Sequence, residues 1–238
     1  MSDYAIFITS SLSIGFIPGF ETMTSETLQL KKPSVKITLI IVLAALSIIM
    51  EALPPLFATP WSMRIDLVAV PWVICWILLG FTAAIICSAI TLPIVAIIGP
   101  FAGGPVGAVM KFVASVWMFS IPALFVFLMR RERRSFIETK WLFAISAFFA
   151  IIVRDVVTIL FNFYFAFPVF FNFSAVEVFS NSNYLSPISH LLGVIGLSAF
   201  IVEIGFWNSI QGVIDIFASW ALGLAVLRRF YPKRSKDS

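Results

Sequence analysis

The sequence predicts an all-α membrane protein, a bundle of six transmembrane helices with the N-terminus and the C-terminus both cytoplasmic. Of its 238 residues, 61% are hydrophobic and 12% are charged, roughly half the charge of a soluble globular domain. The apolar residues form runs suited to a hydrocarbon core of ~30 Å, and the basic residues gather between the runs. We therefore expect a lipid bilayer around the chain and no nucleic-acid partner.

Six apolar runs follow one another without a polar linker, which indicates one transmembrane domain over residues 31–238. They cover residues 37–52, 67–80, 81–98, 106–129, 141–167 and 206–226. The first two are short for a span. Residues 1–30 are expected to form an N-terminal tail or an interfacial segment. The apolar stretch 191–204 is too short for a span of its own, and it is either an external helix or part of the last span.

Three basic clusters predict the orientation. They precede the first span, join the fourth to the fifth, and follow the sixth: Lys31, Lys32 and Lys36; Arg130, Arg131, Arg133, Arg134 and Lys140; Arg228, Arg229, Lys233, Arg234 and Lys236. Six spans place all three clusters on one side of the membrane, which the positive-inside rule makes cytoplasmic. The segments 51–66, 99–105 and 168–205 are then external, and loops as long as the first and third are often functional.

Polar residues inside the last span share one helical face. Asn208, Gln211 and Asp215 stand at i, i+3 and i+7, and such residues in a membrane helix usually face a partner, a cavity or a substrate. The fifth span carries Arg154 and Asn162 at i and i+8, again on one face. Hydrogen bonds between helices would also explain these residues.

Depth in the membrane divides these residues into two groups. Arg154 and Asp215 are deep, and we interpret them as a structural charge pair; Lys111 with Asp155 is a second candidate pair. Asn162, Asn208, Gln211 and Lys111 lie nearer the outer end and are expected to converge on an outward-facing pocket.

Aromatic residues are expected to complete this pocket. The candidates either line the pocket or belong to an interfacial aromatic belt. They are Phe161, Phe163, Tyr164, Phe165 and Phe167 at the outer end of the fifth span, and Trp61 and Trp207 near the outer interface. Amides combined with flat aromatic rings suit a neutral, planar ligand that forms hydrogen bonds.

The sequence contains no catalytic constellation. It has no carboxylate pair, no nucleophile with a base, no phosphate-binding loop and a single histidine, His190. Cys75 and Cys87 lie inside apolar runs and are interpreted as core residues. We expect neither an enzyme nor a bound cofactor or metal.

Small residues four apart mark close helix contacts, either within the bundle or with a partner protein. The pairs are Ala83 with Cys87, Ala84 with Ser88, Gly103 with Gly107, and Ala221 with Ala225.

The order of several motifs resembles the substrate-binding S components of energy-coupling factor (ECF) vitamin transporters, and among these the riboflavin-specific type. The similar stretches are Ala44-Ala45-Leu46, Ile65-Asp66-Leu67-Val68-Ala69-Val70-Pro71, Gly80, Asn162-Phe163-Tyr164 with Pro168, and Phe206-Trp207-Asn208-Ser209-Ile210-Gln211-Gly212. The resemblance covers residues from about 31 to the C-terminus. Two positions depart from the family pattern, because Gln211 stands where the family usually has Lys and Lys111 where it often has Asn.

The resemblance implies a protein of the prokaryotic plasma membrane that binds riboflavin from outside. It implies docking on a membrane coupling protein driven by two cytoplasmic ATPases. The binding residues it carries over are Asn162, Asn208 and Gln211, with Asp66 at the entry of the second span. Two alternatives remain open, namely an S component for another vitamin or heterocycle, and a membrane scaffold whose polar residues only pair with one another.

Overall fold

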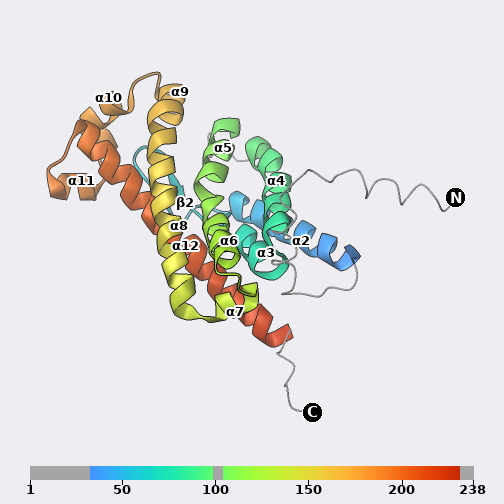
Figure 1. The fold of residues 1–238 in the computed structure, drawn as a ribbon. Helices are drawn as coiled ribbons and strands as arrows, with labels where there is room; N and C mark the ends of the chain where they lie inside the picture. The colour runs from blue at the N-terminus through green and yellow to red at the C-terminus, as the bar shows by residue number, and fades with distance from the viewer. Residues whose placement is uncertain (1–32, 99–103, 231–238) are drawn as a thin grey trace, which may run out of the picture.

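The computed structural model describes residues 33–98 and 104–230, and Figure 1 shows them as a helical bundle with short helices gathered at one end. The bundle helices are α2 (Pro33–Ala52), α3 (Val70–Leu79), α4 (Phe81–Ile98), α5 (Gly104–Ser115), α6 (Trp117–Leu128), α7 (Arg133–Glu138), α8 (Lys140–Phe161) and α12 (Gly196–Phe230). The expected segment 1–30, the basic residues Lys31, Lys32, Lys233, Arg234 and Lys236, and Gly103 of one small-residue pair lie outside the described residues.

Shorter elements join α8 to α12 and α2 to α3. They are a π-helical turn (Asn162–Ala166), α9 (Phe167–Phe171), α10 (Ala175–Ser180), a 3₁₀ turn (Ser182–Tyr184), α11 (Pro187–Leu192) and the hairpin strands β1 (Phe57–Ala58) and β2 (Arg64–Ile65). The hairpin is antiparallel, with Phe57 opposite Ile65. We call α9, α10, α11 and the connections between them the cap.

Five helical segments are long and apolar enough to cross a membrane. They are Pro33–Ala52, Phe81–Ile98, Gly104–Leu128, Lys140–Phe171 and Gly196–Phe230. The predicted second span corresponds to α3, which has 10 residues and a length of about 15 Å, half of a hydrocarbon core. The protein is therefore a helical membrane protein, while six spans and two cytoplasmic termini stay predictions.

The last helix begins ten residues earlier than predicted. α12 runs without a break through 35 residues, or about 50 Å, which exceeds the ~30 Å hydrocarbon core. Most of the stretch 191–204 is thus the first part of α12, and only its first two residues belong to α11. Residues 196–205 therefore continue into the last span as one helix, while their position outside the membrane stays a prediction.

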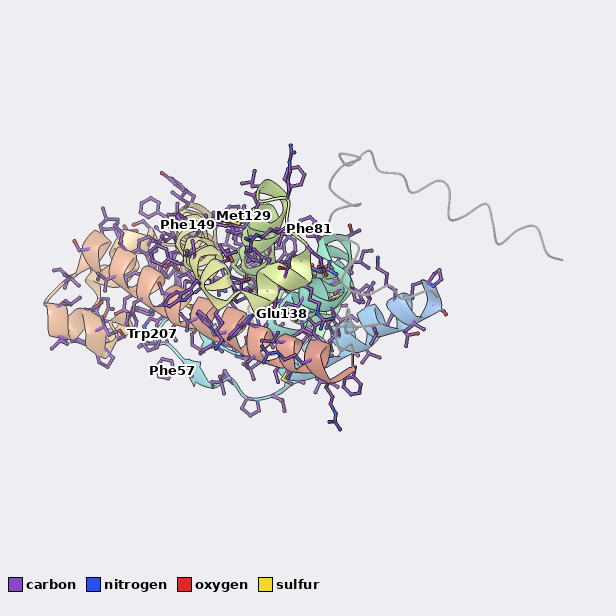
Figure 2. All side chains as sticks on the ribbon, turned by 60° about the horizontal axis from the view of Figure 1, so that its bottom comes forward. Phe57, Phe81, Met129, Glu138, Phe149 and Trp207 are labelled. Carbon is purple, nitrogen blue, oxygen red and sulfur yellow. The ribbon has the colours of Figure 1, made fainter. Side chains whose placement is uncertain are left out.

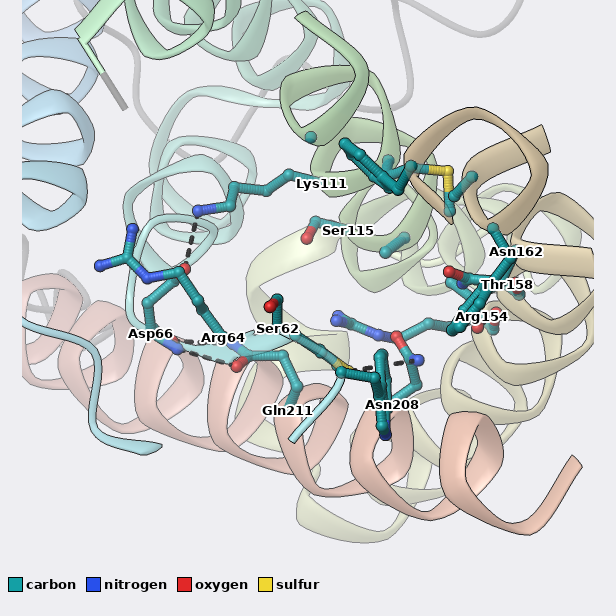
Figure 3. Close-up of a pocket in the computed structure, with 18 of the residues that line it drawn as sticks. Ser62, Arg64, Asp66, Lys111, Ser115, Arg154, Thr158, Asn162, Asn208 and Gln211 are labelled. Carbon is teal, nitrogen blue, oxygen red and sulfur yellow. Dashed lines mark hydrogen bonds and ion pairs between the residues drawn. The ribbon is translucent and has the colours of Figure 1, made fainter. Parts of the chain in front are cut away.

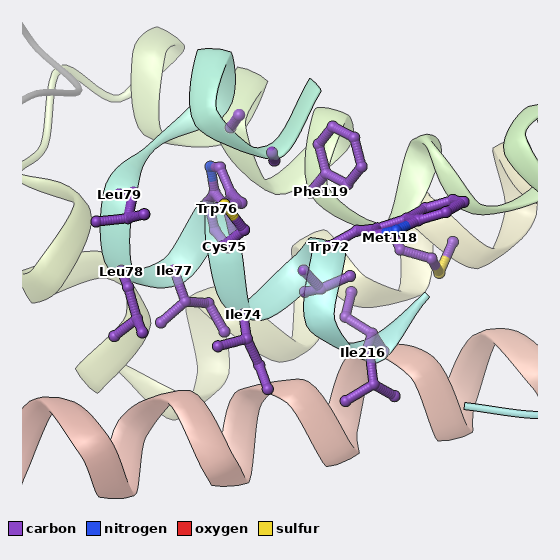
Figure 4. Close-up of a cluster of buried hydrophobic side chains, with 14 of the residues drawn as sticks. Trp72, Ile74, Cys75, Trp76, Ile77, Leu78, Leu79, Met118, Phe119 and Ile216 are labelled. Atoms are coloured by element: carbon purple, nitrogen blue, oxygen red, sulfur yellow. The ribbon is translucent and has the colours of Figure 1, made fainter. Parts of the chain in front are cut away.

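Helix α3 forms the centre of the main hydrophobic core. All ten of its residues are buried, and Figure 4 shows them between α12 and the other bundle helices. Residues of α2, α4, α6, α7, α8 and α12 pack in the same core. At one end of α3, Arg133 of α7 donates a hydrogen bond of 3.2 Å to the carbonyl oxygen of Leu78. This end of the bundle is therefore closed by the basic connection that joins α6 to α8.

A second hydrophobic core holds the cap onto α12. It contains Phe167, Phe179 and Phe200 with Trp61 from the hairpin. Hydrogen bonds also stabilise this region. The buried carboxylate of Glu203 accepts them from Ser186 and Ser189 at the start of α11 and from Trp207. The bundle and the cap thus have separate apolar cores joined by one continuous helix.

Candidate ligand-binding site

A cavity of about 440 Å³ is lined by the hairpin, helices α5, α8, α9 and α12, and the π-helical turn, and Figure 3 shows the polar side chains around it. Its volume lies within the usual range for small-molecule sites, about 300–1,000 Å³. The lining residues are Trp61, Ser62, Met63, Arg64, Asp66, Gly107, Met110, Lys111, Ala114, Ser115, Arg154, Thr158, Asn162, Ala166, Phe167, Phe170, Phe171, Asn208 and Gln211. Trp61 and Phe167 of the second core line it together with polar residues of the bundle helices α5, α8 and α12, so the cavity lies where the cap meets the bundle.

Three cations and three carboxylates form a connected network along this cavity. They are Arg64, Lys111, Arg154, Glu51, Asp66 and Asp215. The formal charges cancel, which satisfies the requirement that buried charges be paired. The network reaches across α2, the hairpin, α5, α8 and α12 and so fixes the cavity walls relative to one another.

Lys111 is the centre of one half of the network. Its Nζ atom contacts Glu51 at the end of α2, and it lies 2.7 Å from Oδ2 of Asp66. Nη1 of Arg64 in β2 lies 3.4 Å from Oε1, the other carboxylate oxygen of Glu51. The hairpin is therefore tied to α2 and α5 by charge, and Lys111 does not contact Asp155 as the sequence had suggested.

Gln211 joins the two halves of the network. Its Oε1 accepts a hydrogen bond of 3.0 Å from the backbone N–H of Asp66, and its Nε2 donates to the Asp66 carbonyl at 2.7 Å. The same Nε2 donates to Oδ1 of Asp215 at 2.7 Å. One amide thus fixes the chain just before α3 against α12, which explains a polar residue at this depth.

Arg154 and Asp215 are brought together as the sequence suggested. Nη1 of Arg154 donates to Oδ2 of Asp215 at 2.8 Å, and both side chains are almost fully buried. Arg154 also lines the cavity, which the sequence interpretation as a purely structural charge did not include. Asp155 points elsewhere and accepts a hydrogen bond of 2.5 Å from Ser209.

Asn162 and Asn208 both lie on the cavity wall. Each side-chain amide donates through Nδ2 to the carbonyl four residues earlier, Asn162 at 2.8 Å and Asn208 at 2.9 Å. Among the described residues, no donor contacts Oδ1 of either amide. Asn162 stands at the start of the π-helical turn, a feature found frequently at functional sites. Two amide oxygens are thus left for a ligand.

Phe165 and Trp207, which the sequence predicted as binding residues, do not line the cavity. Phe165 lies in the π-helical turn and is partly exposed outside the cavity. Trp207 stacks on Phe57 of the hairpin with ring centroids 4.6 Å apart. Figure 2 labels both residues. Consecutive residues of a helix point about 100° apart, so Trp207 faces away from the wall that Asn208 forms.

Two residues of the aromatic wall were among the aromatic candidates of the sequence, namely Trp61 and Phe167, and two were not, namely Phe170 and Phe171. Trp61 of the hairpin and Phe167, Phe170 and Phe171 of α9 line the cavity. Ser62 and Ser115 add hydroxyl groups, and Ser115 lies one turn beyond Lys111 on α5. Helical spacing from Lys111 is the signal that could have indicated Ser115, whereas nothing in the sequence indicates which loop residues fold back over the bundle.

The free polar atoms of the cavity are suited to binding a ligand by hydrogen bonds. Both oxygens of Glu51, Asp66 and Asp215 accept from protein donors, so the network offers no carboxylate oxygen without a donor. Amide oxygens, hydroxyl groups and the outer edge of Arg154 remain. Among the described residues, no group of three or more His, Cys, Asp or Glu side chains could hold a metal ion.

Comparison of the chain with protein-family models, with curated proteins and with solved structures finds no match.

Proposed function

We propose that the protein is the substrate-binding membrane subunit of an ECF-type importer and that its cavity binds riboflavin. The observation that carries the proposal is the cavity itself, where Asn162, Asn208 and Gln211 meet beside Asp66 and Lys111. Four of these five residues were predicted as binding residues from the family resemblance, and they come from stretches far apart in the chain. Their meeting at one cavity supports a binding site made from them.

The chemistry of the cavity supports a neutral heterocyclic ligand. The charges of the network cancel, and two amide oxygens stay available for ligand N–H groups. Aromatic side chains of α9 and the hairpin supply flat apolar surfaces for stacking. A scaffold whose polar residues only pair with one another would leave no such atoms unpaired, and the cavity therefore favours a binding protein.

The proposal includes six membrane crossings with both termini in the cytoplasm. Helix α3 supports this count despite its length, because it begins beside Gln211 at the cavity and ends at Arg133 in the basic connection. It thus runs from the cavity to the end of the bundle that carries the basic connection. A membrane coupling protein and two cytoplasmic ATPases would drive transport, since the sequence carries no phosphate-binding loop.

Flavin binding by the purified protein tests the proposal. Protein purified in detergent should carry a visible flavin absorbance, and ligand-free protein should quench riboflavin fluorescence at one site per chain. Asn208→Ala should weaken binding by about 1–3 kcal/mol, because a ligand donor loses its acceptor. Asn183→Ala is the matched control, because this exposed amide lies outside the cavity.

One outcome would overturn the riboflavin proposal, and another would change the residues of the site. Absence of retained flavin together with no quenching would exclude riboflavin, and mass spectrometry of small molecules extracted from the same preparation would identify another ligand. Equal affinities of wild-type protein and Asn208→Ala for riboflavin would remove Asn208 from the site.

A further inference from the structure

Arg154 is only partly satisfied by the protein around it. Its side chain is almost fully buried, and its Nη1 is paired with Asp215. Within the described part of the chain, neither Nε nor Nη2 has a hydrogen-bond acceptor. A guanidinium group carries five N–H donors in a planar fork, and buried donors without partners are costly. Figure 3 shows this side chain directed into the cavity.

The carboxylates of the charge network cannot serve this second edge without giving up other contacts. Asp155, whose Oδ1 has no donor among the described residues, leaves α8 about 100° away from Arg154. Asp215 already uses Oδ1 for Gln211 and Oδ2 for Arg154. Asp66 uses Oδ1 for the backbone N–H of Val68 and Oδ2 for Lys111. The acceptor for the free edge of Arg154 must therefore come from outside the charge network.

The charge balance indicates that this acceptor is neutral. The three cations and three carboxylates of the network already sum to zero. An anionic ligand would give this poorly hydrated site a net negative charge, which is unfavourable in a low-dielectric environment. A carbonyl oxygen beside a ring nitrogen offers two neutral acceptors at the spacing of a guanidinium edge.

We propose that Arg154 binds the ligand directly, with Asp215 holding one side of its guanidinium group while the other side donates to a neutral pair of acceptors on a heterocycle. The ligand class is then a carbonyl-bearing nitrogen heterocycle such as a pyrimidine dione fused to further rings. Asn162, two helical turns beyond Arg154 on α8, supplies an oxygen for a ligand N–H group. This inference rests on the proposed function of the cavity and adds a residue that determines specificity.

Arg154→Lys separates ligand contact from structural pairing. A lysine keeps a positive charge for Asp215 but lacks the planar second edge. We expect riboflavin to bind about 10- to 100-fold more weakly to this variant, the range for a lost hydrogen bond to a charged group. Arg134→Lys is the matched control, because Arg134 pairs with Glu138 outside the cavity, and its riboflavin affinity should equal that of wild-type protein.

Ligand analogues show whether any loss comes from a direct contact. Riboflavin is compared with its 1-deaza, 5-deaza and 2-thio analogues, each of which removes or weakens one acceptor. At least one analogue should bind wild-type protein about tenfold more weakly than riboflavin and should lose no further affinity in Arg154→Lys. For each analogue, the affinity for riboflavin is divided by the affinity for the analogue. If this ratio is the same in wild-type protein and in Arg154→Lys for every analogue, Arg154 is structural only and the inference is wrong.

The neutral character of the ligand and the proposed function are tested separately. If riboflavin 5′-phosphate binds more tightly than riboflavin, the conclusion that the ligand is neutral is wrong. If wild-type protein binds no flavin, the riboflavin proposal fails, and lumazine, a neutral pteridine dione, decides the inference alone. Lumazine binding that is weakened in Arg154→Lys would support it, whereas no lumazine binding, or binding unaffected by that substitution, would overturn it.

Discussion

Arg154 on α8 and Asp215 on α12 form an ion pair of 2.8 Å although 61 residues separate them in the chain. Both side chains are buried, and Gln211 donates to the second oxygen of Asp215. Buried ion pairs are weak evidence for stability, but a buried charge left without its partner is strongly destabilising. The pair therefore makes the two helices depend on each other.

Asp215→Ala should destabilise the protein by about 3–5 kcal/mol, because it leaves the guanidinium of Arg154 buried without a counter-charge. The double variant Arg154→Met/Asp215→Leu should recover most of this loss, since two apolar side chains of similar volume need no partner. Thermal unfolding of the ligand-free protein in detergent measures both.

The control for this pair is Asp155→Ala. Asp155 follows Arg154 directly but is only partly buried and contacts Ser209, so its removal should cost about 1 kcal/mol. If Arg154→Met/Asp215→Leu is as unstable as Asp215→Ala, the unpaired charge does not cause the loss of stability. The cause is then the packing of α8 against α12.

Lys111→Met should also destabilise the protein, because Glu51 and Asp66 would then share a site without the cation between them. We expect a loss of about 3–5 kcal/mol, as for other broken buried pairs. Lys140→Met is the matched control, because this lysine is exposed at the start of α8. Unfolding in detergent is again the measurement.

A second substitution shows whether Lys111→Met destabilises the protein through repulsion between Glu51 and Asp66 or through lost packing. Adding Glu51→Gln to Lys111→Met removes one of the two facing carboxylates and should restore part of the stability. A double variant that is less stable than Lys111→Met would contradict the assignment of Lys111 as the counter-charge of this carboxylate pair.

The sequence predicted the parts of the fold that depend on regular helices. The spans 81–98, 106–129 and 141–167 match described helical segments closely, and the Arg154–Asp215 pair followed from helical spacing and depth. Wherever the polar residues of a site lie on long helices, periodicity alone indicates which of them share a face.

The parts it missed depend on how the connections fold. Glu51 was assigned to an external segment, so the carboxylates that hold Lys111 were not foreseen. Trp61 and Trp207 were both candidates for the pocket and only Trp61 lines it, because a loop carries no periodicity that would show which aromatic side chain turns inward. The sequence did not show that α3 is buried on every side, since a buried helix and a lipid-facing helix are equally apolar.

The contacts between Ser174 and Glu177 predict that the stability of α10 in the cap decreases at acidic pH. Ser174 caps α10, its hydroxyl and backbone N–H both donate to the Glu177 carboxylate, and these hydrogen bonds lower the pKa of Glu177. Because the folded pKa is the lower one, the contribution to stability is present above the ordinary glutamate pKa and is lost as the pH falls through the folded value.

Hydrogen exchange of the α10 amides measures this contribution. Exchange, corrected for its intrinsic pH dependence, should accelerate when the pH falls below the ordinary glutamate value. Ser174→Ala should raise the pKa of Glu177 and speed exchange in α10 at neutral pH. Ser180→Ala is the control, because this hydroxyl only donates to a carbonyl within the same helix. Identical exchange in wild-type protein and Ser174→Ala would exclude the capping role.

Gly223 fixes the closest approach of α12 to α3, a role the sequence had suggested for the neighbouring small residues. Ala221 and Ala225 are exposed, whereas a Cβ on Gly223 would lie 2.8 Å from Cγ2 of Ile77. Gly223→Ala should therefore destabilise the protein by about 1–3 kcal/mol through overpacking, although alanine is the better helix former.

Two further variants make this prediction specific. Gly205→Ala, also on α12, should be neutral or slightly stabilising, because its nearest neighbour would be Ile159 at an ordinary 3.9 Å. Ile77→Ala removes the clashing atoms, so adding Gly223→Ala to it should cost less than Gly223→Ala costs alone. Unfolding free energies that simply add would show that Gly223 and Ile77 are not in contact, and α3 would then have to sit farther from α12.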